Sequence, residues 1–292
     1  MKQKGAKPSW SILPPDLMQS LLEETKAKGW QKAILSSKNK KIRDIYLFTD
    51  SPARADGSFY LSLTPESRVL DLGAGLGSYA FALAPRVASV VAADATLESL
   101  EFIKLRASQD KVNNLTTVQI EPLDYAKLPF PDQSFDAIIM NGVLEWVGSY
   151  VETDDPLRLQ ENCLREVRRV LKPFGELWLG IENRFGRRYF NGAPDDHLKY
   201  YQGSKIAYTT IVPRFVANLI TRKKLGQPYR TYTHSLPGYK RLLKRTGFKE
   251  TQFFYPDPDY RAVAVKITPI ESKAVVNPIF CDSYFILGRG GQ

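Results

Sequence analysis

The sequence predicts an α/β fold built on a doubly wound, mostly parallel sheet. Between residues 67 and 182, short apolar runs alternate with helical patterns, which is typical of parallel strands joined by crossover helices. A glycine-rich loop ends the first apolar run, and an acidic residue ends the second. Ligands of such sheets bind outside the carboxyl ends of the strands, so both features fall where a binding site is expected.

Five strands and two clear helices are predicted in this region. The strands are Arg68–Leu72, Ser89–Asp94, Thr117–Ile120, Phe135–Met140 and Glu176–Ile181. The helices cover Leu97–Ser108 and Leu157–Leu171. In the second helix, Leu164 and Val167 recur at helical spacing on one side, and Pro173 follows its end.

Residue composition and apolar patterning divide the chain into four regions. We expect a helical extension at 1–66, the core at 67–182, a cap insertion with its following helix at 183–250, and strands that complete the sheet at 251–292. The cap is rich in aromatic and basic residues and contains a basic amphipathic helix at 213–224. An insertion after the fifth strand is expected to pack over the strand ends, so it is interpreted as a substrate cap.

Composition limits the class of protein without choosing a partner. The 292 residues carry a formal net charge of +10, which favours nucleic acid, a phosphorylated substrate or an acidic membrane surface. Cys163 and Cys281 are too few for a disulfide framework and fit a reducing cytosol. No apolar run approaches membrane-spanning length and no secretory signal is visible, so we expect a soluble, cytoplasmic protein.

The glycine-rich loop carries the functional argument. Gly73, Gly75 and Gly77 follow Asp71 at the end of the first strand and open a helix. Glycines let the backbone turn sharply and approach a ligand closely, and the helix start beyond them offers free N–H groups. A dinucleotide site would place its third glycine at position 78, which is Ser78, so a pyrophosphate cradle is the weaker interpretation.

Two further acids follow the next two strands. Asp94 closes the second strand and is expected beside the glycine loop, where it can accept hydrogen bonds from two ribose hydroxyls. Asp124 follows the third strand and could accept a hydrogen bond from an adenine amino group, while Leu123 or Ala95 packs on the ring. The order of the three features favours a nucleoside ligand.

This order resembles the class I S-adenosylmethionine-dependent methyltransferases, from about Arg68 to Phe174. The resemblance implies a seven-stranded Rossmann-like sheet and S-adenosylmethionine as cofactor, with S-adenosylhomocysteine as product. It assigns cofactor contacts to Asp71, Gly73, Gly75, Gly77, Asp94, Ala95, Leu123, Asp124 and Asn141. Phe174 departs from the family's usual LKPGG turn, which touches turn geometry and not chemistry. No metal is implied.

A narrower resemblance covers the cap and links the chain to a bacterial subgroup of these enzymes. It rests on segments such as 141–146, 181–186, 189–194, 229–234 and 255–260. Members of the subgroup are associated with cell-surface glycan or secondary-metabolite biosynthesis. The resemblance therefore implies O-methylation of a glycan, glycolipid or small secondary metabolite. The alternatives are an RNA or other nucleic-acid methyltransferase, and a cofactor-binding regulator without turnover.

Three residues are the leading candidates for the general base that a hydroxyl acceptor needs. Glu182 and Asn183, just past the fifth strand, are further candidates that could equally have a structural role in a turn. His197 follows two aspartates that could orient its ring, although it could also cap a turn. Glu145 follows the fourth strand and reaches the expected cleft, or it could be a carboxylate on the cofactor side or at a helix start. His234 precedes a helix predicted at 237–245 and could instead support the start of that helix.

Two kinds of anionic partner remain compatible with the methyltransferase interpretation. Arg187, Arg188 and Arg214 could hold a phosphate on the acceptor. The basic helix at 213–224 could contact the inner membrane surface, where lipid-linked acceptors lie.

Overall fold

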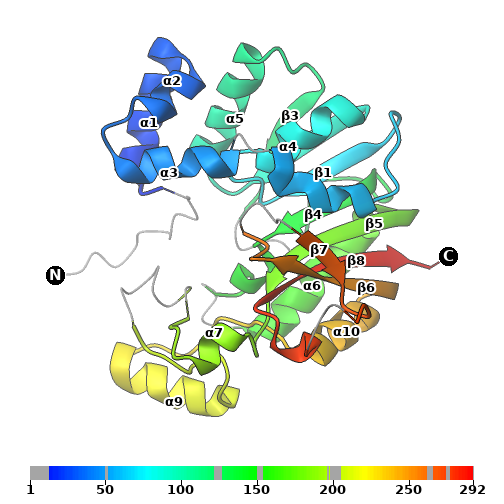
Figure 1. The fold of residues 1–292 in the computed structure, drawn as a ribbon. Coiled ribbons are helices and arrows are strands. Elements are labelled where there is room, and N and C mark those ends of the chain that lie inside the picture. Colours follow the sequence, from blue (N-terminus) through cyan, green and yellow to red (C-terminus); the bar gives the residue numbers. More distant parts are fainter. Residues whose placement is uncertain are drawn as a thin grey trace.

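The computed structural model describes residues 13–49, 52–121, 127–149, 154–195, 197, 205–261, 266–273 and 277–291. Its centre is an eight-stranded sheet with the order β3-β2-β1-β4-β5-β8-β6-β7 (Figure 1). The strands are β1 (Arg68–Leu72), β2 (Ser89–Asp94), β3 (Leu115–Gln119), β4 (Phe135–Asn141), β5 (Leu171–Glu182), β6 (Phe248–Asp257), β7 (Lys266–Pro269) and β8 (Ser283–Gly290). The helices are α1 (Pro15–Lys28), α2 (Trp30–Leu35), α3 (Lys40–Thr49), α4 (Ser78–Leu83), α5 (Leu97–Gln109), α6 (Pro156–Val170), α7 (Arg187–Phe190), α9 (Arg214–Leu225) and α10 (Leu236–Arg245), with short 3₁₀ helices η1 (Pro52–Tyr60), η2 (Ala84–Arg86), η3 (Leu144–Trp146) and η4 (Pro278–Phe280).

The predicted fold class is confirmed, with one strand more than the seven expected. Strands β1 and β2 have the predicted bounds, whereas β5 begins at Leu171 and is longer than predicted. The additional strand is β7, which pairs antiparallel with β6 at the edge of the sheet. Its short sequence, Lys266–Pro269, lacks the apolar alternation that marks a half-buried strand.

The parallel half of the sheet creates the point at which a ligand is expected. β1 pairs in parallel with β2 on one side and with β4 on the other, so the chain leaves β1 at the centre and winds outward in both directions. A crevice forms where the strand order reverses in this way. The carboxyl ends of β1, β2 and β4 therefore define the candidate site.

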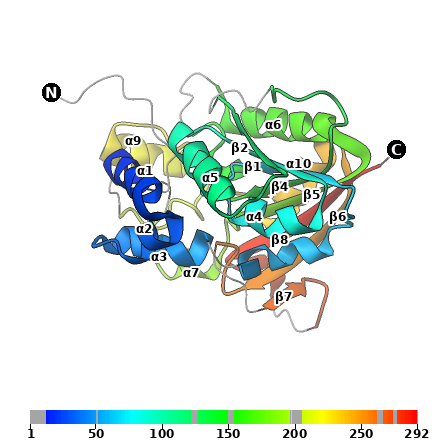
Figure 2. The same ribbon diagram turned by 90° about the horizontal axis from the view of Figure 1, so that it is seen from above.

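Two apolar cores lie on opposite faces of the sheet. Along β5, Leu177 and Leu179 contribute to the core under α6 and α10, whereas Trp178 contributes to the core under α4 and α5. Successive side chains of a strand point to opposite faces, and both faces are buried because helices cover both (Figure 2). This two-sided burial explains why the strands are apolar runs without alternation.

The helical extension predicted at 1–66 packs against α5. The guanidinium of Arg106 lies between two aromatic rings, 3.9 Å from the centroid of Trp30 and 4.0 Å from that of Phe81. Trp30 also donates its indole N–H to Asp110 (2.9 Å) and its backbone N–H to Gln109 (2.8 Å). A cation between two rings is favourable, so these contacts join α2 to the core.

The carboxyl ends of the parallel strands face the helices that flank the site. In Figure 1, α1–α3 and the pair α7 and α9 all lie on the left, which is the side where β5 ends. The direction of β5 can be read from β8: β8 leads to the C-terminus on the right, and β5 is antiparallel to it and therefore runs to the left. The region 183–250, predicted as a cap, therefore includes elements beyond the strand ends.

We expect Trp30→Ala to lower the free energy of unfolding by about 3–5 kcal/mol, because it deletes a buried ring and leaves a cavity beside Arg106. Denaturant unfolding followed by circular dichroism measures this change. Phe174→Ala is the control, because Phe174 is an exposed aromatic residue and its loss should change stability by less than about 0.5 kcal/mol. Equal midpoints for both variants would contradict the role given to Trp30.

Candidate functional site

The glycine loop turns tightly between β1 and α4. Gly73 has φ of +75° and donates its N–H to the carbonyl of Ala93 (2.7 Å). A Cβ on Gly73 would lie 2.4 Å from a methyl carbon of Val143, and one on Gly77, where φ is +83°, would lie 2.9 Å from the ring of Phe81. A side chain is therefore excluded at both positions by conformation and by space.

Asp94 ties the glycine loop to the end of β2. Its two carboxylate oxygens accept from the backbone N–H of Gly75 (2.9 Å) and of Thr96 (2.8 Å). The carboxylate is buried, and burial raises its pKa above the ordinary range. The predicted neighbourhood of Asp94 and the glycine loop is therefore observed, while its contact with a ribose stays a prediction.

Asp71 has a structural contact in addition to the cofactor role predicted for it. Its Oδ2 accepts from the backbone N–H of Ala80 (3.0 Å) in the first turn of α4. A carboxylate at this place satisfies one of the free N–H groups at the start of the helix. Burial raises the pKa of Asp71 to about 7, against this hydrogen bond and the positive charge of Arg54.

Of the other predicted cofactor residues, Ala95 and Asn141 lie at the same edge of the sheet. Ala95 lies in the turn between β2 and α5, whereas Leu123 and Asp124 lie outside the described residues. Asn141 ends β4, where its amide nitrogen is 3.5 Å from the carbonyl of Tyr260. Its Oδ1 is buried and has no hydrogen-bond partner in the part of the chain that the structure describes. A buried acceptor of this kind needs a donor, which a ligand can supply.

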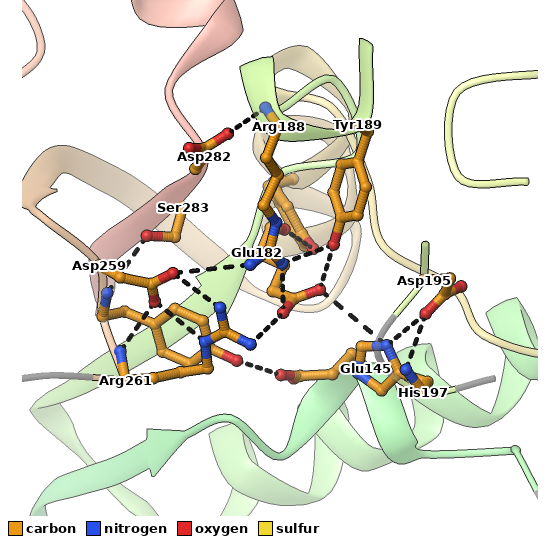
Figure 3. A network of polar contacts seen from close by, with 12 residues as sticks. Glu145, Glu182, Arg188, Tyr189, Asp195, His197, Asp259, Arg261, Asp282 and Ser283 are labelled. Carbon is orange, nitrogen blue, oxygen red and sulfur yellow. Dashed lines mark hydrogen bonds and ion pairs between the residues drawn. The ribbon is translucent and has the colours of Figure 1, made fainter. Parts of the chain in front are cut away.

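A second group of polar side chains lies beyond β4 and β5, as Figure 3 shows. Glu145, in η3, is completely buried and accepts at Oε1 from the hydroxyl of Tyr260 (2.9 Å). Its other oxygen, Oε2, is buried and finds no hydrogen-bond partner among the described residues. Burial raises the pKa of Glu145 to about 7, although the positive charge of His197 opposes the rise.

Glu182, at the end of β5, is satisfied by several donors. Its Oε1 lies 2.6 Å from Nη2 of Arg188 and 3.4 Å from Nη1 of Arg261, and its Oε2 accepts from the hydroxyl of Tyr189 (2.6 Å). Asp259 pairs with Arg261 and lies 3.8 Å from Arg188. The two arginines balance these two acids, so Glu182 is held as part of a paired cluster.

His197 is held by an aspartate that is itself held by a tyrosine. Nδ1 of His197 lies 2.8 Å from Oδ1 of Asp195, and Oδ2 of Asp195 accepts from the hydroxyl of Tyr229 (2.8 Å). The ring also contacts Trp146 edge to face, with centroids 4.3 Å apart. Burial alone would lower the pKa of His197, but the hydrogen bond to Asp195 and the nearby carboxylates raise it to about 9.

His234 lies in a different environment from His197 and Glu145. Its Nε2 contacts Oε1 of Gln160 (2.8 Å), and Arg214 approaches its Nδ1 at 3.5 Å. Burial and the charges of Arg214 and Arg184 lower its pKa to about 3. At the start of α10, Ser235 caps the helix by accepting from the N–H of Gly238 (3.3 Å), and the ring of His234 contacts that of Tyr239 edge to face, with centroids 5.2 Å apart. A supporting role of His234 at this helix start stays a prediction.

The segment between β4 and η3 joins the two parts of the site. Val143 packs against Gly73, whereas a Cβ on Gly142 would lie 3.3 Å from the ring of Tyr260 and 3.8 Å from Oε1 of Glu145. One short stretch of backbone, Gly142 and Val143, therefore separates the glycine loop from Glu145 and Tyr260. Sequence reasoning named Glu145 and His197 but missed Tyr260, although the segment 255–260 had drawn attention as part of the narrower resemblance.

The comparison with protein families identifies the first part of the site. Residues 70–179 match a family model described as a methyltransferase domain. These residues form a class I S-adenosylmethionine-dependent methyltransferase domain. The enzyme class of such domains is EC 2.1.1, and their cofactor is S-adenosylmethionine.

Curated relatives align mainly with this domain. The uncharacterized methyltransferase YcgJ of Bacillus subtilis is 35% identical over 114 residues, which are 39% of this chain and 40% of that protein. Demethylmenaquinone methyltransferase of Symbiobacterium thermophilum is 27% identical over 199 residues, 65% of this chain and 71% of that protein. The chain thus aligns with less than half of the length of YcgJ.

Solved structures extend the likeness of the fold over nearly the whole chain. Phosphoethanolamine N-methyltransferase 1 of Haemonchus contortus has a TM-score of 0.53 at 14% identity, covering 95% of this chain and 49% of that one. A possible histamine N-methyltransferase of Thermotoga maritima has a TM-score of 0.50 at 17% identity, covering 92% and 98%. At these identities the comparison shows the fold.

The residues around the glycine loop fit the cofactor of the methyltransferase domain. Gly73, Gly75 and Gly77 all have positive φ and leave the loop without side chains. Asp94 supplies acceptors beside them, and the buried Oδ1 of Asn141 can accept a hydrogen bond from a ligand.

Among the described residues, the helices are too short or too polar to span a membrane.

Asp94→Asn is expected to weaken the binding of S-adenosylmethionine about 10- to 100-fold, because hydrogen bonds to a buried charged acceptor contribute about 1.5–3 kcal/mol. Isothermal titration calorimetry with the cofactor and with S-adenosylhomocysteine measures the change. Asp132→Asn is the matched control, since Asp132 is an exposed carboxylate paired with Arg169. An unchanged dissociation constant for Asp94→Asn would end its assignment to the cofactor.

Proposed function

We propose that the chain is an S-adenosylmethionine-dependent methyltransferase that methylates a hydroxyl group of a small molecule. The match of residues 70–179 to a methyltransferase domain carries the reaction type. When bound, the cofactor supplies an activated methyl group on a sulfonium. The chain must then hold the acceptor in line with that methyl and remove the proton of the hydroxyl, for which aligned approach contributes about 7–11 kcal/mol.

Within this proposal Glu145 is the general base. Its Oε2 is the one carboxylate oxygen of Glu145 left without a hydrogen bond, so it can accept the proton of a hydroxyl. Tyr260 holds Oε1 and fixes the orientation of the group. A pKa of about 7 matches a base that must be ionised near neutral pH and still hold a proton after the transfer.

His197 takes a different role from the one first considered for it. With a pKa of about 9, its ring is protonated at neutral pH and cannot accept a second proton. Its Nδ1–H donates to Asp195. The resulting positive charge lies near Glu145 and stabilises the carboxylate form of that residue. His197 is therefore proposed as a positioning residue, and His234, with Nε2 on Gln160, takes no part.

The acceptor class remains as the narrower resemblance implies: a glycan, a glycolipid or a secondary metabolite. The aromatic side chains Trp146 and Phe190 support this choice, since aromatic rings stack on sugars and on other flat, weakly polar faces. Trp146 lies beside His197, and Phe190 is exposed on α7. Incubation of purified protein with methyl-labelled S-adenosylmethionine and fractionated cell extract tests the class. Label in nuclease-sensitive material would contradict it.

Glu145→Gln is expected to lower the rate of methyl transfer about 10²–10⁴-fold while leaving cofactor affinity unchanged. In the unsubstituted protein kcat/KM should rise with pH and level off above about 7, because only the carboxylate form accepts a proton. The variant should lose this rise. Glu250→Gln, at an exposed glutamate, is the matched control. A Glu145→Gln enzyme with the original rate and pH profile would remove Glu145 as base.

His197→Gln separates the two candidate bases by its effect on the pH profile. Loss of the imidazolium removes a positive charge that favours ionised Glu145, so the rise in kcat/KM should move to a pH above 7. If His197 were instead the base, the variant would lose the rise altogether. The measurement is the same pH series, with the cofactor dissociation constant as a check that the site is intact.

A further inference from the structure

One face of α9 exposes large apolar side chains between basic ones. Phe215 and Leu219 are one helical turn apart and are 69% and 64% exposed. Positions four apart lie on the same side of a helix, so the two side chains form one apolar strip. Arg222 and Lys223, in the last turn, are exposed and flank the strip on either side at helical spacing.

The opposite face of α9 is fixed to the rest of the chain. Ala217 is buried against Tyr229, and the backbone N–H of Tyr229 donates to Oδ1 of Asn218 (3.1 Å). Arg184, just beyond β5, donates to the carbonyl of Thr210 in the loop before the helix (2.9 Å). The helix is therefore held by its inner side, and Figure 1 shows it at the outer edge of the molecule.

The stretch of sequence that contains α9 carries charge of one sign. Between residues 197 and 249 the sequence contains twelve Lys and Arg residues and no Asp or Glu. The remainder of the chain holds twenty-nine basic residues against 31 acidic ones, so the net charge of +10 arises in this segment. An apolar strip flanked by the exposed cations Arg222 and Lys223 is complementary to an anionic bilayer, where lipid tails take up the apolar side chains and headgroups neutralise the cations.

We infer that α9 docks on the surface of an anionic lipid bilayer. The apolar strip, defined as Phe215 and Leu219, enters the interface between headgroups and acyl chains. Arg222 and Lys223 lie at the level of the headgroups and contact their phosphates. This inference concerns membrane contact and does not depend on methyl transfer, so failure of one leaves the other standing.

Flotation of the full chain with lipid vesicles tests the inference. Vesicles of phosphatidylcholine with phosphatidylglycerol should carry the protein, and vesicles of phosphatidylcholine alone should carry far less. Raising NaCl from about 0.1 M to about 1 M shortens the Debye length from about 10 Å to about 3 Å and should release most of the bound protein. Equal binding to both vesicles, or binding to neither, would overturn the inference.

Paired variants locate the contact on α9. Arg222→Gln with Lys223→Gln should lower the partition coefficient about 30-fold, since each basic residue near an anionic surface contributes about 1 kcal/mol. The charge-matched control is Lys40→Gln with Lys41→Gln, at exposed lysines of α3. Equal loss in this control would show attraction by net charge alone and would overturn the assignment to α9.

A second pair tests the apolar strip. Phe215→Ala with Leu219→Ala should lower the partition coefficient about tenfold or more, because the strip no longer buries apolar area in lipid. The control is Leu35→Ala with Phe174→Ala, which removes an exposed leucine and an exposed phenylalanine elsewhere. If the strip variant binds vesicles unchanged, or if sedimentation shows that the strip joins two copies of the chain in solution, the inference fails.

Discussion

Burial of carboxylates at the carboxyl edge of the sheet constrains the site more than any other feature. Asp71, Asp94, Glu145 and Glu182 are all buried there, and a buried charge is costly unless it is paired or hydrogen-bonded. Each acid therefore fixes the segment that supplies its partners. Asp71 accepts a hydrogen bond from the start of α4, and Asp94 joins the glycine loop to the turn after β2. Glu182 forms ion pairs with Arg188 of α7 and with Arg261.

The partners of these acids decide which of them can do chemistry. Asp94 uses both oxygens on backbone N–H groups, and Glu182 is paired with two arginines and a tyrosine. Glu145 accepts at Oε1 from Tyr260, and its buried Oε2 has no hydrogen-bond partner among the residues that the structure describes. Burial raises the pKa of both Asp71 and Glu145 to about 7. Among the described residues, Glu145 differs from Asp71 in keeping a buried carboxylate oxygen without a hydrogen-bond partner, so Glu145 is the acid of this set that can accept a proton from a ligand.

The sequence predicted elements whose pattern is local and missed those set by distant partners. β1 and β2 were predicted with their observed bounds because each is a short apolar run next to a glycine loop or an acid. β7 was missed because its four residues follow the edge of β6 and carry no pattern of their own. The pair Glu145 and Tyr260 is 115 residues apart in sequence, so no spacing rule links them. The tautomer and charge of His197 likewise depend on Asp195 and on carboxylates from other elements.

The positive net charge of the chain comes from one segment of the sequence. The +10 balance suggested several anionic partners when taken as an average, yet it arises between residues 197 and 249, the part of the chain that contains α9 and α10. The methyltransferase domain at 70–179 lies outside this basic segment. Within this segment, α9 exposes Arg222 and Lys223 beside its apolar strip. Because screening limits electrostatic fields to about a Debye length, the attraction of these two residues for anions acts on what approaches α9. A surface that attracts lipid and a buried acid that holds a proton can then be varied independently, since Arg222 and Lys223 are in α9 and Glu145 is in η3.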